Sequence, residues 1–285
     1  MSTRTRGAGL DIVDSHSHVW TLDTAAYPWR PTFGIIPTEP ALPGELLAAM
    51  DAHGVAHTLL VQPSAYGSDH RFMLAAVREN PARFSAIGLL EPCDPGTAEL
   101  AATLIAAGCV GFRVNLSLDL RIAEQQAAAD TWSQLGALGV PICIRATPEH
   151  QDQVERIVAG HSDTQFVVDH LGLPEPGTAT EAIGRLSALA RFDNCLLKLA
   201  GVWRASAFEP PFQDAWPILS SAFDNFGSSR LVWGSDYPAV RPGGGYREAI
   251  DVIRLLPFVD ADDLDKVMAG TARSCWNLPE RTPGP

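Results

Sequence analysis

The sequence predicts a single (β/α)8 TIM barrel, and three observations lead to this prediction. Eight short apolar runs recur along the chain, and most of them precede a stretch with helical spacing. Continuous apolar runs, each followed by a helix, are typical of parallel strands that are buried on both faces. A length of 285 residues suits such a barrel, which usually takes about 250 residues. The eight runs are residues 10–16, 56–62, 84–90, 109–115, 140–146, 165–172, 194–200 and 230–236.

Four stretches between these runs carry recognisable helix signals. Small polar residues cap the first turn of a helix, and glycine in the left-handed conformation commonly ends one. We therefore expect N-caps at Asp69, Thr97 and Thr147, and helix ends at Gly108 and Gly139. The four stretches are residues 67–80, 94–108, 121–139 and 147–161.

The chain is expected to form one domain. No linker rich in proline, glycine or serine and no run of charges divides it. We predict a barrel over residues 10–278, between a flexible N-terminal tail at 1–9 and a C-terminal tail at 279–285.

A long loop is expected after the first strand, over residues 21–45. Loops of this length inside a compact fold are usually functional or disordered. The segment is rich in proline and aromatic residues, and Tyr27, Trp29 and Phe33 favour packing over disorder. We expect a lid over one end of the barrel.

The composition excludes several classes of function. A net charge of -12 disfavours nucleic acid as a partner, because such binding needs lysine and arginine facing phosphates. No apolar run approaches the ~20 residues of a membrane span. The opening residues lack the apolar segment of a secretory signal, so we expect a cytoplasmic protein. An odd number of widely spaced cysteines favours reduced thiols over disulfides. They are Cys93, Cys109, Cys143, Cys195 and Cys275.

Polar and ionisable residues collect at the C-terminal ends of the runs, where a barrel of this kind builds its active site. His16 and His18 flank one serine, and residues two apart in a strand share a face. Polar residues also gather wherever a strand leaves a core. However, three histidines, an aspartate and several cations in place of ordinary turn residues favour a site. The candidates are His16, His18, Gln62, Ser64, Tyr66, Glu91, Arg113, Asn115, Arg145, His170, Lys198 and Asp236.

Four motifs, "DSHSHVW", "VVDHLGLP", "LLKLAGVWR" and "WGSDYP", resemble the amidohydrolase superfamily. The resemblance covers about residues 10–278. It is strongest to the amidohydrolase-2 branch, which holds 2-pyrone-4,6-dicarboxylate lactonase and sugar-lactone hydrolases. It implies a barrel that hydrolyses a lactone ester. Asp236 would then be the general base for the attacking water, with His16, His18 and His170 around the carbonyl.

Cationic residues at the strand ends indicate an anionic substrate. Arg113, Arg145, Lys198 and Arg204 lie at or just beyond predicted strand ends. The guanidinium group presents a planar fork that matches a carboxylate. Together these residues favour a small carboxylated lactone from aromatic or sugar-acid catabolism.

The resemblance adds two substrate-binding candidates and one departure. Ser64 and Tyr66 match positions where the dicarboxylate lactonases meet substrate carboxylates. After the fourth run, Asp119 stands where the pyrone lactonase pattern has a second arginine, and Arg121 follows two residues later. The pyrone dicarboxylate is therefore not assigned as the substrate.

The sequence leaves a metal open but favours catalysis without one. His16, His18 and Asp236 offer three nitrogen and oxygen ligands, which suit zinc or manganese. Arg145, however, stands where metal-dependent relatives would carry another histidine, and a guanidinium repels a cation. We therefore expect no required cofactor, as the resemblance also implies.

Two rival functions stay open at this point. One is a metal-dependent decarboxylase of the same superfamily, and the other is a barrel that binds an acidic metabolite without turning it over. Asp236 argues against the pure binder, because a carboxylate repels an anionic ligand. The expected partner is a small anionic lactone, and assembly into a homo-oligomer is left open.

Overall fold

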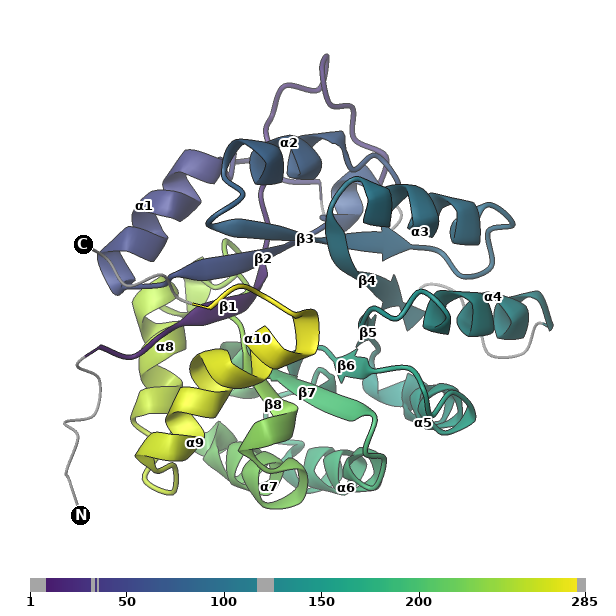
Figure 1. Ribbon diagram of the computed structural model, residues 1–285. Helices are drawn as coiled ribbons and strands as arrows, with labels where there is room; N and C mark the ends of the chain where they lie inside the picture. Colours follow the sequence, from purple (N-terminus) through teal and green to yellow (C-terminus); the bar gives the residue numbers. More distant parts are fainter. Residues whose placement is uncertain (1–8, 32–33, 35, 117–125, 281–285) are drawn as a thin grey trace.

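Eight parallel strands follow one another around a barrel in chain order (Figure 1). The computed structural model describes residues 9–31, 34, 36–116 and 126–280. Each strand pairs in parallel with the next one along the chain. The eight apolar runs form these eight strands, so the predicted barrel is confirmed. The strands are β1 (Val13–Ser17), β2 (His57–Val61), β3 (Phe84–Leu90), β4 (Cys109–Asn115), β5 (Ile142–Arg145), β6 (Phe166–Val168), β7 (Cys195–Leu199) and β8 (Leu231–Trp233).

Helices surround the strands (Figure 1). One large apolar core lies between the sheet and this outer layer, and a smaller one fills the barrel itself. Ala272 and Trp276 of the last helix belong to the inner core, so this helix covers the N-terminal end of the barrel. The helices are α1 (Pro43–His53), α2 (Arg71–Glu79), α3 (Thr97–Ala106), α4 (Gln126–Gly136), α5 (Gln151–Gly160), α6 (Ala179–Ala190), α7 (Trp216–Phe226), α8 (Tyr246–Arg254), α9 (Ala261–Asp265) and α10 (Thr271–Trp276).

Inward-facing side chains change from apolar to charged along the strands. Side chains two apart in a strand point to the same face. On β5, Cys143 belongs to the inner core and Arg145 follows it two residues later. On β7, Leu196 belongs to the inner core and the fully buried Lys198 follows it. The C-terminal end of the barrel is therefore charged on the inside.

The barrel closes between β1 and the segment after β8. Ser17 and Tyr237 form a parallel bridge, and the His18 N–H donates to the Tyr237 carbonyl over 2.8 Å. The Asp236 N–H donates to the His16 carbonyl, also over 2.8 Å. These closing bonds join the two segments that carry the predicted histidine pair and the predicted base.

Two of the expected helix caps are wrong. The N-cap positions of α2 and α3 are His70 and Gly96, not Asp69 and Thr97. The Asp69 carboxylate is turned toward the guanidinium of Arg71, at 2.7 Å. Thr97 is the first residue of α3, and its hydroxyl donates to a carbonyl that precedes the helix. The local sequence therefore predicts where each helix begins to within one residue. It does not predict the cap, because the Asp69 and Thr97 side chains bind Arg71 and a preceding carbonyl instead.

The other predicted cap and helix-end residues agree better with the structure. Thr147 occupies the N-cap position of a 3-10 turn, Pro148–His150, which leads into α5, and its hydroxyl contacts His150 Nδ1 at 2.7 Å. Gly108 and Gly139 follow α3 and α4 with φ angles of 100° and 69°. Both lie in the left-handed region that favours glycine. The predicted helix end is confirmed at Gly108, directly after the C-cap of α3, whereas α4 ends at Gly136, three residues before Gly139.

The chain between β1 and α1 packs with aromatic contacts. Trp29 stacks on Tyr66 with ring centroids 4.7 Å apart, and Tyr27 meets Phe72 edge-on at 5.0 Å. Phe33, the third aromatic residue of the predicted lid, lies outside the described residues. The movement of this segment stays a prediction.

Two further expectations from composition can be compared with the structure. All five cysteines are free thiols, in agreement with the prediction of reduced cysteines. Among the described residues, no helix combines the length and the apolar character that crossing a membrane requires.

His70 shows how a buried histidine makes stability depend on pH. Its Nε2 accepts from the Leu89 N–H over 3.0 Å, and its Nδ1–H donates to the Ser68 carbonyl over 2.8 Å. The bond from Leu89 requires a neutral ring, because a protonated Nε2 cannot accept. Burial lowers the pKa of His70 below 6.5, so its contribution is complete above about pH 6.5 and is lost as pH falls through its lower folded pKa.

We therefore expect His70→Gln to reduce the loss of unfolding free energy between about pH 7.5 and pH 5, measured by urea denaturation. Glutamine keeps an acceptor for Leu89 but does not titrate. His53→Gln on α1 is the matched control, because His53 is half-buried and contacts a carbonyl of its own helix. Equal pH dependence in His70→Gln and the wild type would contradict the assignment.

Candidate active site

A buried network of charges lies beneath the C-terminal end of the barrel. Asp169, directly after β6, accepts from Arg113 Nε of β4 at 2.8 Å and lies 2.9 Å from Lys198 Nζ of β7. Burial by itself raises the pKa of Asp169, but Lys198 and Arg113 outweigh it and hold the pKa well below its usual value. The two cations and the carboxylate lie directly beneath the histidines, and Asp169 and Lys198 both contact His16.

His16 and His18 face each other, as their spacing along the strand predicts. Their Nε2 atoms are 3.2 Å apart, and the two rings are nearly perpendicular. His18 Nδ1 lies 2.7 Å from the Val61 carbonyl, which can only accept, so this nitrogen carries the proton. Burial lowers the pKa of His18 to about 3 and that of His16 well below its usual value. Both rings are neutral, and His18 Nε2 presents a lone pair.

Asp236 lies after β8 and points at this pair. Its Oδ1 is 3.8 Å from the Nε2 atoms of both His16 and His18, and its Oδ2 is 3.3 Å from Arg204 Nη2. Burial raises the pKa of Asp236 to about 6, although Arg204 and Arg113 act in the opposite direction. A carboxylate with this pKa is ionised at neutral pH and still basic enough to take a proton.

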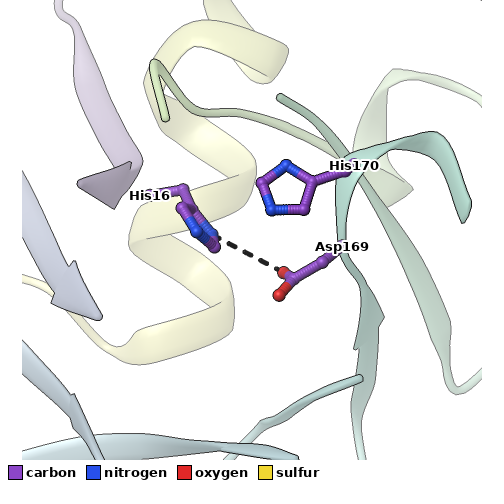
Figure 2. Close-up of side chains that lie close together, drawn as sticks. All are labelled: His16, Asp169 and His170. Atoms are coloured by element: carbon purple, nitrogen blue, oxygen red, sulfur yellow. Dashed lines mark ion pairs between the residues drawn. The ribbon is translucent and has the colours of Figure 1, made fainter. Parts of the chain in front are cut away.

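His170 completes the group of imidazoles. It follows Asp169 with a φ of 54°, and its ring packs against that of His16 with centroids 4.6 Å apart. Figure 2 shows His16, Asp169 and His170 together, and its dashed line joins His16 Nδ1 to Asp169 Oδ1, which lie 3.7 Å apart. Burial lowers the pKa of His170 well below its usual value, so this ring is also neutral. Its Nδ1 has no protein partner among the described residues.

Asp14 was not identified from the sequence, yet it holds the two halves of the site together. Its carboxylate accepts from the backbone N–H of His16 at 3.0 Å and of Ser235 at 2.8 Å. It also accepts from the hydroxyls of Ser235 and Tyr246, each at 2.6 Å. Gly234 allows this close approach, since a Cβ there would lie 2.8 Å from His16 Cβ. Asp14 thus fixes β1 against the segment that carries Asp236.

A cavity of about 420 Å³ opens above these groups. Its lining includes three guanidinium groups and apolar side chains from the β1–α1 segment, among them Trp20, which the sequence did not single out as a site residue. Burial lowers the pKa of Arg145 to about 10, which leaves it cationic at neutral pH. The predicted site residues that line the cavity are His18, Ser64, Arg113, Arg145, His170, Arg204 and Asp236.

Two of the predicted substrate-binding residues are absent from this lining. The Tyr66 hydroxyl accepts from the Thr21 N–H at 2.9 Å and donates to the Thr21 carbonyl at 3.2 Å, so it anchors the β1–α1 segment. Lys198 lies below the cavity and is fully buried beside Asp169. Asp119 and Arg121, where the chain departs from the pyrone lactonase pattern, lie outside the described residues.

The spacing of three donor atoms at this site matches that around one divalent metal ion. His16 Nε2, His18 Nε2 and Asp236 Oδ1 are separated by 3.2, 3.8 and 3.8 Å. Ligands about 2.0–2.1 Å from a tetrahedral zinc ion have similar separations. A second group, His16, Asp169 and His170, also lies close together. It does not fit a cation, because Lys198 and Arg113 already occupy the Asp169 oxygens.

A (β/α)8 barrel whose mouth combines histidines, a carboxylate and cationic side chains defines an enzyme of the amidohydrolase class. The model of the amidohydrolase family matches residues 13–278. The chain therefore belongs to the amidohydrolase family, which agrees with the resemblance in its motifs.

Relatives with assigned activities include lactone hydrolases. The chain is 26% identical over 289 residues to an L-fucono-1,5-lactonase of Burkholderia multivorans, covering 94% of this chain and 96% of that protein. It is 26% identical to a 4-sulfomuconolactone hydrolase of Rhizobium radiobacter, covering 79% and 75%. A crystal structure of an amidohydrolase from Burkholderia multivorans with bound zinc is 25% identical with a TM-score of 0.82, covering 94% of this chain and all of that chain.

Proposed function

We propose that this protein hydrolyses a small carboxylated lactone by attack of water on the ring ester. The observation that carries the proposal is Asp236, a carboxylate with a pKa of about 6 beside neutral imidazoles, below a cavity lined by three guanidinium groups. Relatives that cover most of this chain are named as hydrolases of lactones, which supports the same reaction.

The chain's own residues supply a base for the water. Asp236 takes a proton from water, the hydroxyl adds to the lactone carbonyl, and the ring C–O bond then breaks. The proton returns from Asp236 to the ring oxygen, so one water is consumed and a hydroxy acid is released. His18 lines the cavity beside this base, with its Nε2 3.8 Å from Asp236 Oδ1.

Donors are needed for the charge that develops on the carbonyl oxygen, and this term is usually the largest in ester cleavage. His170 is a neutral ring in the cavity lining, and Arg145 adds a cationic group there, whereas His16 is fully buried and supports the site from below. A divalent metal bound by His16, His18 and Asp236 would supply the same stabilisation as a Lewis acid.

The charge of the cavity favours an anionic substrate. Among the residues that the structure describes, Arg113, Arg145 and Arg204 line it together with one carboxylate, that of Asp236. Arg113 is almost fully buried and bonded to Asp169, so it presents little of its guanidinium group to a ligand. Arg204 is 42% exposed, and its guanidinium lies over the Trp203 ring at 4.2 Å, which orients the group toward the cavity. We assign Arg204 and Arg145 as the main partners of a substrate carboxylate.

A panel of lactones tests the proposal directly. Five- and six-membered lactones with and without a carboxylate are offered to the purified protein, and acid release is followed with a pH indicator. We expect turnover to be fastest on carboxylated rings. Failure to open any lactone, together with release of carbon dioxide from an aromatic or β-keto acid, would overturn the proposal.

That second outcome identifies the rival function, a metal-dependent decarboxylase. The three donor atoms of His16, His18 and Asp236 keep it open, because their spacing fits a metal. Carbon dioxide release is measured in the same panel, before and after addition of zinc or manganese.

Removal of metal also distinguishes lactone hydrolysis from metal-dependent decarboxylation. We expect protein treated with a chelator to keep most of its lactonase activity, because Asp236 and the imidazoles supply a base and donors without a metal. Metal content is measured by elemental analysis on the same samples. Loss of activity on chelation, restored by zinc or manganese, would make His16, His18 and Asp236 metal ligands instead.

A further inference from the structure

Lys198 is unusual because its ammonium group is completely buried. The chain has two lysines, and the other one, Lys266, is exposed. Lys198 is fully buried and stands over the Trp276 ring, with its Nζ 5.7 Å from the ring centroid. It is below the cavity, so it does not reach a ligand there. A buried ammonium is costly unless each of its N–H groups has a partner.

The three N–H groups of Lys198 have three acceptors within reach. Nζ lies 2.9 Å from Asp169 Oδ1, 3.5 Å from Cys143 Sγ and 3.2 Å from His16 Nδ1. An ammonium group only donates. The third contact is therefore satisfied only when His16 Nδ1 carries a lone pair. A proton on that nitrogen would face the ammonium and leave a buried donor without a partner.

The contacts on the other side of His16 require the same arrangement. His18 Nδ1–H donates to the Val61 carbonyl, so His18 Nε2 presents its lone pair to His16 Nε2 at 3.2 Å. The pair is attractive only if His16 Nε2 carries the proton. Asp169 Oδ1 competes for His16 Nδ1, but it lies farther away, at 3.7 Å, and is already bound by Lys198.

We infer that Lys198 is a positioning residue that fixes His16 as the Nε2–H tautomer and thereby makes it a hydrogen-bond donor rather than a metal ligand. Each residue then donates a hydrogen bond to the next one, from Lys198 to His16, from His16 to His18, and from His18 to the Val61 carbonyl. A zinc ion between His16, His18 and Asp236 needs a lone pair on His16 Nε2. Binding it would move the His16 proton to Nδ1, against the ammonium of Lys198.

This inference concerns the proposed site but does not rest on the identity of the substrate. Substitution of Lys198 removes the donor to His16 Nδ1. The ring can then turn its Nδ1–H toward Asp169, as metal-bound histidines commonly do toward a carboxylate. Partners of this kind change metal affinity by about 10- to 100-fold.

The first test is a zinc titration of chelator-treated protein, followed by calorimetry. We expect Lys198→Met to bind one zinc ion about 10-fold or more tightly than the wild type does. The gain should disappear in Lys198→Met combined with Asp236→Asn. Lys266→Met, the same change at the exposed lysine, should bind zinc as the wild type does. Unchanged or weaker zinc binding by Lys198→Met would overturn the inference, as would a gain that survives the Asp236→Asn change.

The second test needs no variant of Lys198 and stands even if Lys198→Met does not fold. Two-bond ¹H–¹⁵N correlation spectra of histidine-labelled wild-type protein report which ring nitrogen carries the proton. We expect His16, assigned by the loss of its signals in His16→Gln, to be the Nε2–H tautomer. A proton on His16 Nδ1 would overturn the inference. Neither test measures turnover, so failure of the lactone panel would leave the result intact.

Discussion

Asp236→Asn is expected to lower kcat by about 10²- to 10⁴-fold with little change in KM, because an amide cannot take a proton from water. The variant should fold. The folded pKa of Asp236, about 6, is above its usual value of 3.8. The stability linked to this raised pKa is therefore present below the usual value and lost as pH rises through about 6, and asparagine carries no such penalty at neutral pH. Asp236→Asn should unfold at no lower urea concentration than the wild type.

The pH profile provides a second measurement on the same residue. For metal-free wild-type protein, kcat/KM should rise with pH through about 6 and level above it, since the base must be ionised. Asp251→Asn on α8 is the matched control and should match the wild type, because Asp251 pairs with Arg247 on the outer surface. An Asp236→Asn variant with kcat within about threefold of the wild type would remove Asp236 from the role of base.

At a pH above the acidic limb of the kcat/KM profile, Arg204→Ala is expected to raise KM about tenfold or more for a carboxylated lactone and to leave KM for an uncharged lactone almost unchanged. A charge-assisted hydrogen bond contributes roughly 1.5–3 kcal/mol. The lower end applies here, because Arg204 is 42% exposed and solvent screens the pair. Arg113→Ala is a poorer test, since Arg113 is buried and bonded to Asp169, and its loss would also affect folding.

Loss of Arg204 also affects the base. Burial raises the pKa of Asp236 and Arg204 lowers it, so the variant should have a still higher Asp236 pKa. The acidic limb of the kcat/KM profile should therefore move to higher pH. Arg247→Ala, at an exposed arginine of α8, is the control and should change neither KM nor the profile. Equal losses on charged and uncharged lactones would instead assign Arg204 a structural role.

The fold follows from the sequence because its signals are local. A short apolar run that is followed by a helical stretch, such as residues 84–90, is typical of a buried parallel strand, and it forms β3 over the same residues. The alternation of side chains then places His16 and His18 on one side of β1, and their Nε2 atoms meet at 3.2 Å. Chain order around the barrel brings His170 and Asp236 to the same end.

The exact role of each polar residue depends on partners distant in sequence, which local patterns do not contain. Lys198 and Tyr66 both lie in motifs with site character. In the structure, however, Lys198 pairs with Asp169 and Tyr66 holds Thr21 of the β1–α1 segment. The motif that contains His170 also contains Asp169, but only the convergence of β4, β6 and β7 makes that aspartate the centre of the charge network.

The sequence by itself determined the eight strands, the end of the barrel at which polar and ionisable residues gather, and the types of those residues. Only the tertiary structure decided which of these groups face the cavity and which support it. The physical reason is that burial and pairing act together. Asp14 and Asp169 are both fully buried carboxylates, yet burial raises the pKa of Asp14, whereas Lys198 and Arg113 overcome it at Asp169. The two residues are identical in the sequence. Their pKa values differ because the charges and hydrogen-bond donors around each carboxylate come from contacts that form only when the barrel closes.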